Sequence, residues 1–226
     1  MKVLVTGASG NLGRYVVESL QLFGLCAVTY NHKNCLEDLD WEGIDCVVNC
    51  AAVIPSAGRS MSDYLLGNVT FLQNLIPYSK DKHFIHFSTF SELYRNSEYQ
   101  QSKMLANSLL LVNTHIFSRL DIISLPTLDD DQLIESIVDS ARKGHKPVVD
   151  KLRYNYISFK EVAVHVVDGL LTGNILPISK KYRVKDLYDE VCKHVTPSLI
   201  VEGATIDRTL NNNGIYNVCP RLLSSF

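Results

Sequence analysis

Apolar positions along the first half of the chain alternate between short continuous runs and a helical spacing. Runs such as Val3–Val5 are typical of buried strands, and apolar residues three and four apart follow from Leu12 to Phe23. The first helix should end near Gly24, because glycine is favoured just beyond a helix. The pattern predicts strands at 3–5, 25–30, 36–40, 44–52, 84–87 and 120–125, and helices at 12–23, 62–78 and 99–112.

Residues 41–43 leave no room for a helix between two of these predicted strands. One crossover is therefore reduced to a turn, which departs locally from regular doubly wound topology. The layout changes at Pro126, which breaks the strand before it. Beyond this proline the pattern predicts helices at 133–141, 159–171 and 184–195, and short strands at 147–149, 154–158, 175–178 and 199–201.

The composition is that of an ordinary globular protein of one large domain, with 226 residues, 46 % hydrophobic and 20 % charged. A net charge of −2 gives no electrostatic argument for binding nucleic acid or an anionic membrane. The apolar runs are too short to span a bilayer, and the N-terminus lacks a secretory pattern, so we expect a cytoplasmic protein. The six cysteines contain no CxxC pair, and we expect them to be reduced, with no structural metal.

A glycine-spaced turn links the first predicted strand to the first predicted helix. Gly7 permits the tight turn, Gly10 lets the backbone approach a pyrophosphate, and Gly13 lets the helix pack closely on the strand. The free N–H groups at the start of the helix would then face the phosphates. The alternative is a glycine-rich turn without a ligand, but the strand–turn–helix context favours a dinucleotide site.

The second predicted strand ends without the acidic residue that usually accepts from the ribose hydroxyls of NAD. Asn31, His32 and Lys33 stand there instead. His32 and Lys33 could meet the 2′-phosphate of NADP, or Lys33 could be a solvated loop lysine. Further on, Asp38 could accept from the adenine amino group or could be a plain surface acid.

Tyr99 and Lys103 lie four residues apart, so they share one face of a predicted helix. An ammonium near a phenol lowers the pKa of the phenol, which can then exchange a proton with a substrate oxygen near neutral pH. The pair follows a strand that ends in Ser88 and Thr89, which strengthens this interpretation. Asn68, near the apolar stripe of the preceding helix, either steadies such a site or is a solvated helix residue.

Together and in this order, these motifs resemble the extended short-chain dehydrogenase/reductases, the nucleotide-sugar epimerase, dehydratase and reductase group. Thr6–Gly13 looks like the family's TGxxGxxG motif, and Tyr99–Lys103 is similar to its YxxxK pair. Similar segments cover nearly the whole chain, at 49–52, 68–75, 125–127, 144–147 and 153–163.

The resemblance implies a role for each matching residue. Tyr99 would be the acid/base, Lys103 would lower its pKa and hold the nicotinamide ribose, and Thr89 would orient the substrate oxygen. Ser88 and Ser91 are rivals to Thr89. The predicted cofactor-binding residues are Gly7, Ser9, Gly10, Asn11, Leu12, Gly13, Asn31, His32, Lys33, Asp38, Leu39, Cys50, Ala51, Ala52, Asn68, Ser88, Tyr99, Lys103 and Pro126.

The chain also departs from this family in three ways. Only nine residues separate Thr89 from Tyr99, where the family usually has a longer loop that helps to shape the substrate site. Phe90 and Ser91 replace the acidic pair of the dehydratases, so reduction or epimerisation is favoured over dehydration. The C-terminal lobe is also short for a full nucleotide-sugar site.

The sequence thus predicts one Rossmann-type α/β domain over 1–226, a doubly wound parallel sheet with a small substrate lobe formed mainly by 127–226. The predicted function is NAD(P)-dependent oxidoreduction or epimerisation at a sugar carbon, for example C4 of a keto-sugar, nucleotide-linked and used for surface polysaccharide. We expect NADP as the cofactor, with NAD as an option, and a small-molecule substrate. A homodimer through helices 62–78 and 99–112 is an option by analogy. The alternative is a non-catalytic NADP-binding sensor or regulatory protein.

Overall fold

The computed structural model describes residues 1–31, 35–89, 97–125, 127–128, 143, 153–175 and 180–183. By their contacts these residues divide into two units, the first within 1–125 and 160–175 and the second within 127–159 and 180–183. Each unit is described by itself below. The first unit holds the glycine turn and the tyrosine–lysine pair.

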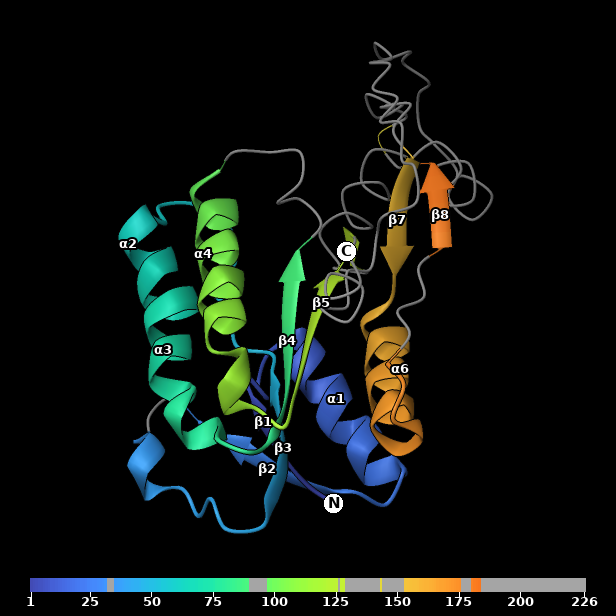
Figure 1. The fold of residues 1–226 in the computed structure, drawn as a ribbon. Coiled ribbons are helices and arrows are strands. Elements are labelled where there is room, and N and C mark those ends of the chain that lie inside the picture. The colour runs from blue at the N-terminus through green and yellow to red at the C-terminus, as the bar shows by residue number, and fades with distance from the viewer. Residues whose placement is uncertain are drawn as a thin grey trace. The chain divides into compact units, whose positions relative to one another are not determined.

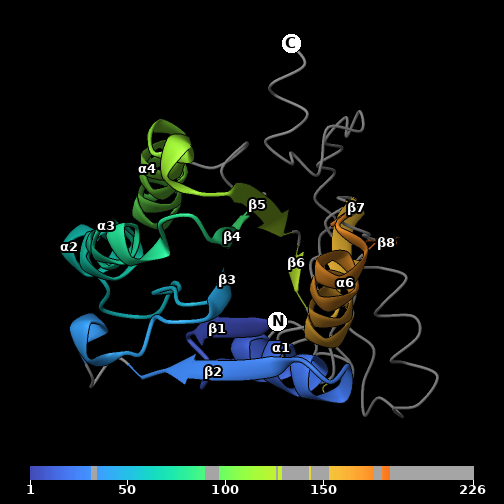
Figure 2. The same ribbon diagram turned by 60° about the horizontal axis from the view of Figure 1, so that its bottom comes forward.

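The first unit is built on a parallel sheet of five strands, shown in Figures 1 and 2. The strand order is β2-β1-β3-β4-β5, and every neighbouring pair is parallel. Runs rich in valine and isoleucine form these strands because branched side chains pack well on a pleated surface. The strands are β1 (Lys2–Thr6), β2 (Cys26–Tyr30), β3 (Ile44–Asn49), β4 (His83–Thr89) and β5 (Arg119–Leu125).

Helices cover both faces of the sheet, as Figures 1 and 2 show. The helices α1 (Asn11–Leu22) and α6 (Phe159–Thr172) lie on one face. The other face carries α2 (Met61–Tyr64), a π-helix (Leu65–Thr70), α3 (Phe71–Leu75) and α4 (Glu98–Val112). Short 3₁₀ helices follow at Pro77–Ser79 and Thr114–Ile116. These layers confirm the predicted Rossmann-type α/β fold.

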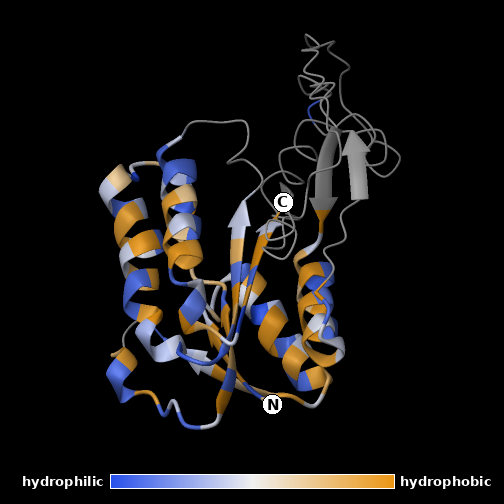
Figure 3. Cartoon of the chain, in the orientation of Figure 1, coloured by the Kyte–Doolittle hydropathy of each residue, from blue (hydrophilic) through white to orange (hydrophobic). Residues whose placement is uncertain are grey.

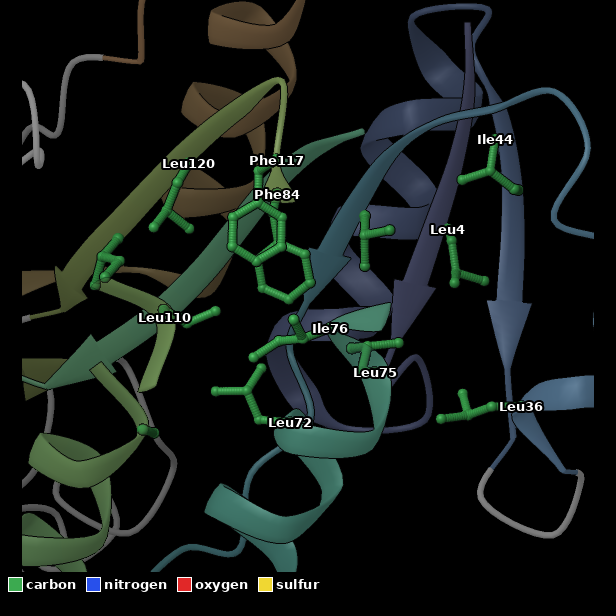
Figure 4. Close-up of a cluster of buried hydrophobic side chains, with 13 residues drawn as sticks. Leu4, Leu36, Ile44, Leu72, Leu75, Ile76, Phe84, Leu110, Phe117 and Leu120 are labelled. Carbon is green, nitrogen blue, oxygen red and sulfur yellow. The ribbon is translucent and has the colours of Figure 1, made fainter. Parts of the chain in front are cut away.

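One hydrophobic cluster of the core lies between the sheet and the α2–α4 layer. In Figure 3 hydrophobic positions dominate the strands, whereas each helix carries hydrophobic and hydrophilic positions. Leu4, Val47, Phe84 and Leu120 sit side by side on four neighbouring strands, in direct register. Figure 4 shows part of this row together with Leu72, Leu75 and Ile76 of the covering helix.

The strand predicted at 36–40 is wrong, because these residues begin with a 3₁₀ helix, Leu36–Asp38. Side-chain contacts explain the difference: Trp41 donates to the carbonyl of Leu36 at 2.8 Å and stacks on Tyr78 with ring centroids 5.2 Å apart. Tyr78 in turn donates to Glu37 at 2.9 Å. These contacts hold residues 36–41 against Tyr78, in the short 3₁₀ helix that follows α3. The turn predicted at 41–43 therefore does not link two strands; it belongs to the connection from β2 to β3, whose described residues contain this 3₁₀ helix.

The helix predicted at 62–78 exists but is not continuous. It begins one residue earlier, at Met61, where Ser60 and Asp63 form a capping box. The chain then widens into the π-helix, a form that often marks functional sites. At its centre, a Cβ on Gly67 would lie 2.2 Å from Cγ2 of Val53, so glycine is needed where the segment after β3 crosses the helix.

The second unit contains a small mixed sheet of order β6-β7-β8. Its strands are β6 (Thr127–Leu128), β7 (Arg153–Ile157) and β8 (Lys180–Arg183). β6 and β7 are parallel, and β7 and β8 are antiparallel. β7 confirms the strand predicted at 154–158, and β8 was not predicted. The helices predicted at 133–141 and 184–195 and the strands at 147–149 and 199–201 lie outside the described residues, as do 176–178 of the strand predicted at 175–178.

Within the described ranges, no helix is long and apolar enough to cross a bilayer. The same residues contain no cluster of His, Cys, Asp and Glu suited to a metal ion.

Candidate functional site

The glycine turn follows β1, and backbone atoms of the chain pack closely around two of its three glycines. Gly7 has a φ of +64°, and a Cβ there would lie 2.6 Å from the backbone nitrogen of Ala51. A Cβ on Gly13 would lie 2.2 Å from the carbonyl oxygen of Gly7, so both positions require glycine for the chain itself. At Gly10 a Cβ would meet only the Gly7 carbonyl, at 3.2 Å. The Gly10 side of the turn is therefore open among the described residues.

The N-terminus of α1 begins at this open side. Its N-cap is Gly10, which offers no side-chain cap, and the first turn contains no acidic residue. Ser9, Gly10 and Asn11 are exposed, and Asn11 accepts from Arg14 at 3.1 Å. Uncapped N–H groups and a missing carboxylate suit an anionic ligand, so this turn fits the pyrophosphate of a dinucleotide.

The segment after β3 lies beside the turn and is fixed by Asn68. The Asn68 amide accepts from the backbone N–H of Val53 at 2.7 Å and donates to the Val53 carbonyl at 3.1 Å. It also donates to Ser102 Oγ on α4 at 2.9 Å. Because Asn68 is buried, the solvated alternative is excluded, and the side chain ties the 50–53 segment to α4.

A row of polar side chains crosses the sheet two residues beyond the apolar row of Leu4, Val47 and Phe84. Thr6 pairs in register with Asn49, and Asn49 pairs with His86, so the three lie on neighbouring strands. Thr6 Oγ1 lies 2.5 Å from Asn49 Oδ1, and Asn49 Nδ2 lies 3.0 Å from His86 Nδ1. All three are buried. We call Thr6, Asn49 and His86 the polar row.

Lys103 of α4 lies at the end of the polar row. Only 2 % of Lys103 is exposed, and its Nζ donates to the carbonyl of Phe87 at 2.6 Å. The same atom lies 3.4 Å from His86 Nε2. Burial, together with the positive charge of Lys103, holds the pKa of His86 well below its ordinary value. A neutral imidazole therefore lies next to the Lys103 ammonium.

Tyr99 stands one helical turn before Lys103, near the start of α4. A capping box formed by Ser97 and Gln100 fixes this start. The Tyr99 ring packs edge-on against Tyr64 at a centroid distance of 5.8 Å, and its carbonyl accepts from Ser102 at 2.6 Å. The Tyr99 side chain is partly exposed, whereas Lys103 is buried.

Comparisons with known proteins agree with this architecture. No family model matches the chain, and no curated protein matches it. A dTDP-4-dehydrorhamnose reductase from Clostridium acetobutylicum matches with a TM-score of 0.70 and 16 % identity, over 91 % of this chain and 84 % of that chain. UDP-glucuronic acid 4-epimerase from Bacillus cereus in complex with NAD matches with a TM-score of 0.72 and 17 % identity, over 92 % and 87 %.

This chain has the fold of the extended short-chain dehydrogenase/reductases. A short-chain dehydrogenase/reductase superfamily protein from Agrobacterium tumefaciens with bound NAD also matches, with a TM-score of 0.66 and 15 % identity over 100 % of this chain and 90 % of that chain. The predicted resemblance is thus confirmed as a likeness of fold.

On this extended dehydrogenase/reductase fold, the two candidate hydroxyls at the end of β4 differ in their surroundings. Ser88 is buried and accepts from Asn107 Nδ2 at 2.9 Å. Thr89 is the last residue of β4 and is partly exposed. This difference supports Thr89 over Ser88 as the hydroxyl that meets a substrate. Ser91 lies outside the described residues.

The other predicted cofactor residues in the described part of the chain either follow a strand of the sheet or lie in or beside a helix. Cys50, Ala51 and Ala52 follow β3, where burial raises the pKa of the Cys50 thiol and keeps it neutral. Asn31 and Asp38 are exposed, and Leu39 packs against the core. Leu12 is buried in the first turn of α1. His32, Lys33 and Pro126 lie outside the described residues.

Sequence reasoning did not assign a role to the polar row beyond the motifs that contain Thr6 and Asn49, and it missed His86. A signal was present, because each residue is a polar side chain at an inward position of an otherwise apolar strand.

Proposed function

We propose that this chain is an NAD(P)-dependent oxidoreductase or epimerase that acts at a carbon of a nucleotide-linked sugar. The observation that carries the proposal is the buried Lys103 amine at the carboxyl end of β4, one turn from the more exposed Tyr99. In open α/β sheets, ligands bind at the carboxyl ends of the strands, and both the pair and the glycine turn belong to those ends.

The residues for a dinucleotide are the glycine turn, the N-terminus of α1 and the 50–52 segment. When bound, the nicotinamide supplies hydride transfer. The open side at Gly10 is where the pyrophosphate would lie. No acidic residue follows β2 directly, since Tyr30 ends the strand and Asn31 comes next. We therefore keep NADP as the expected cofactor, with Lys33 as its 2′-phosphate ligand, although related folds are known with NAD.

The chain's own chemistry is proton exchange at the substrate oxygen. Tyr99 would give or take this proton through its phenol oxygen, and the Lys103 ammonium would favour the phenolate. Thr89 would hold the same substrate oxygen by a hydrogen bond. The names of the matching structures, which act on dTDP- and UDP-linked sugars, support a sugar nucleotide as substrate. We favour reduction or epimerisation over dehydration, and we propose that the product is used for the synthesis of surface polysaccharide.

The cofactor part is tested by calorimetry with NAD and NADP on the wild type and on Gly10→Val. The larger side chain would occupy the open side of the turn, so binding should be abolished while thermal unfolding stays cooperative. Gly10→Ala adds one methyl group and should weaken binding less, because that Cβ meets only the Gly7 carbonyl at 3.2 Å. Unchanged affinity in folded Gly10→Val would refute the dinucleotide site.

The catalytic part is tested by Tyr99→Phe, with dTDP- and UDP-linked keto-sugars as substrates. Proton transfer by a positioned side chain contributes roughly 10²–10⁴-fold, so turnover should fall by about that factor. Dinucleotide affinity should stay nearly unchanged. Tyr78→Phe is the control, because Tyr78 lies at the far end of the helical layer and bonds Glu37. A chain that binds dinucleotide but shows no turnover that depends on Tyr99 would be the sensor instead.

A further inference from the structure

His86 has no part in the proposed reaction, yet it stands between the polar row and Lys103. It is 1 % exposed, and both of its ring nitrogens have a polar neighbour. A buried histidine that only filled space would need no such pair of contacts. Its imidazole is neutral, so one nitrogen carries a proton and the other carries a lone pair.

The charge of Lys103 decides which ring nitrogen of His86 carries the proton and which carries the lone pair. The contact from Lys103 Nζ to the Phe87 carbonyl is 2.6 Å, as short as charge-assisted hydrogen bonds are. An ammonium donates and cannot accept, so His86 Nε2, at 3.4 Å, must present its lone pair to Lys103. The proton of the imidazole then lies on Nδ1.

This assignment passes along the polar row. A protonated Nδ1 needs an acceptor, so the amide oxygen of Asn49 must face it across the 3.0 Å contact. The amide nitrogen then faces Thr6. A 180° flip of the Asn49 amide exchanges the positions of its oxygen and nitrogen and leaves the rest of the side chain in place. The Thr6 hydroxyl can donate or accept, so it matches either face of the amide.

We propose that His86 is a positioning residue, which accepts from Lys103 through Nε2 and is held as the Nδ1-protonated tautomer by Asn49 and Thr6. Two of the three N–H bonds of Lys103 are thereby directed at Phe87 and His86. The ammonium is fixed relative to Tyr99, one turn earlier on α4. The catalytic consequence rests on the proposed function, whereas the tautomer does not.

The tautomer is tested on the wild-type protein by long-range ¹H–¹⁵N NMR of the imidazole rings. The chain has seven histidines, and the loss of one set of signals in His86→Gln assigns the set of His86. We expect a protonated Nδ1 and an unprotonated Nε2 near neutral pH. A proton on Nε2, or on both nitrogens, would overturn the proposal whether or not the protein is an enzyme.

A matched pair of variants tests the positioning role. Glutamine places an acceptor where Nε2 stands, and asparagine places a donor near Nδ1. His86→Gln should therefore keep most of the turnover, while His86→Asn should lose at least about tenfold in kcat, as for one lost hydrogen bond to a charged group. The opposite order would mean that the contact with Asn49 matters and the one with Lys103 does not.

Dinucleotide affinity and thermal unfolding are measured on both variants, because a purely structural residue would lower stability and leave kcat per folded molecule unchanged. Loss of kcat in His86→Asn beyond that in an equally destabilised Val47→Ala supports positioning. If the wild type shows no turnover at all, the proposed function fails, and the NMR result still decides the proposal on His86.

Discussion

Two histidines of β4, three residues apart, occupy opposite kinds of site. His83, at the amino end, has Nε2 2.7 Å from Oδ2 of the buried Asp121, whose carboxylate Arg119 also contacts, with Nε at 2.6 Å from Oδ2. His86, near the carboxyl end, lies between Asn49 and Lys103. The amino-end cluster, His83, Arg119 and Asp121, joins a guanidinium and an imidazole to one carboxylate, whereas the contacts at the carboxyl end join a cation to neutral acceptors.

The two sites also lie on opposite faces of the sheet. Arg119 donates to the carbonyl of Gly173, just after α6, so the amino-end cluster faces α6. His86 faces α4 through Lys103. Under the proposed function, the difference separates two tasks: the contacts around the Asp121 carboxylate stabilise the fold at one end, and a positive charge held by neutral groups would serve chemistry at the other end. The tyrosine–lysine pair therefore depends on hydrogen bonds in the sheet beneath it, and the amino-end cluster should be separable from it.

Asp121→Ala should have the largest effect on stability of the changes considered below. It leaves Arg119 and His83 without their shared carboxylate, and breaking a buried pair costs about 3–5 kcal/mol. We expect the lower end, about 3 kcal/mol in the free energy of unfolding by urea, because Arg119 and His83 are partly exposed. Dinucleotide affinity should not change.

The pH dependence of this loss serves as its control. Burial raises the pKa of Asp121, but hydrogen bonds and charge from His83 and Arg119 outweigh burial and hold it below its ordinary value. Asp121 therefore stabilises the fold above the unfolded pKa of about 3.9, and this contribution is lost as the pH falls through the lower folded pKa. The difference between wild type and Asp121→Ala should narrow below about pH 4. A constant difference would show that packing, and not charge, is lost.

The strands and long helices could be predicted because short apolar runs and helical spacing follow directly from burial on a sheet or against one. The segment at 36–40 could not, since the aromatic contacts of Trp41 and Tyr78 join residues 37 apart in sequence. The π-helix also escaped prediction. Within this segment Gly67 and Asn68 pack against Val53, a contact that no local pattern reveals.

The candidate site likewise has parts that a local sequence pattern reveals and parts that depend on contacts between residues far apart in sequence. The glycine turn and the Tyr99–Lys103 spacing are local patterns, so the sequence alone could mark them. The polar row joins three strands that are far apart in sequence, and only the register of the sheet brings Thr6, Asn49 and His86 together. The bonds from Lys103 to Phe87 and His86 depend likewise on how α4 crosses β4.

Asn49→Val should have a smaller effect on stability than Asp121→Ala but a larger effect on the candidate site. Valine leaves Thr6 and His86 buried without the amide, which costs about 1–3 kcal/mol of unfolding free energy. Because His86 then loses the group that fixes its ring, turnover should fall on the order of tenfold, as for a lost hydrogen bond to a charged group.

Val47→Ala is the matched control for Asn49→Val. Val47 lies two residues earlier on the same strand and the same face, in the apolar row beneath the helices. It should lower stability by cavity formation and leave turnover per folded molecule unchanged. Equal losses of turnover in the two variants would remove the functional distinction between the polar and the apolar row.

Gly67→Ala should have the smallest effect on stability and act at a distance from both histidines. The new methyl group would lie 2.2 Å from Val53 Cγ2, so Val53 must move, at a cost of about 1 kcal/mol. Val53 shares both of its backbone hydrogen bonds with Asn68, which also bonds Ser102 between Tyr99 and Lys103. Dinucleotide affinity should therefore fall more than stability does. The double variant Gly67→Ala with Val53→Ala removes the clash and should recover affinity. If the double variant binds no better than Gly67→Ala alone, the 50–53 segment is not placed by this contact.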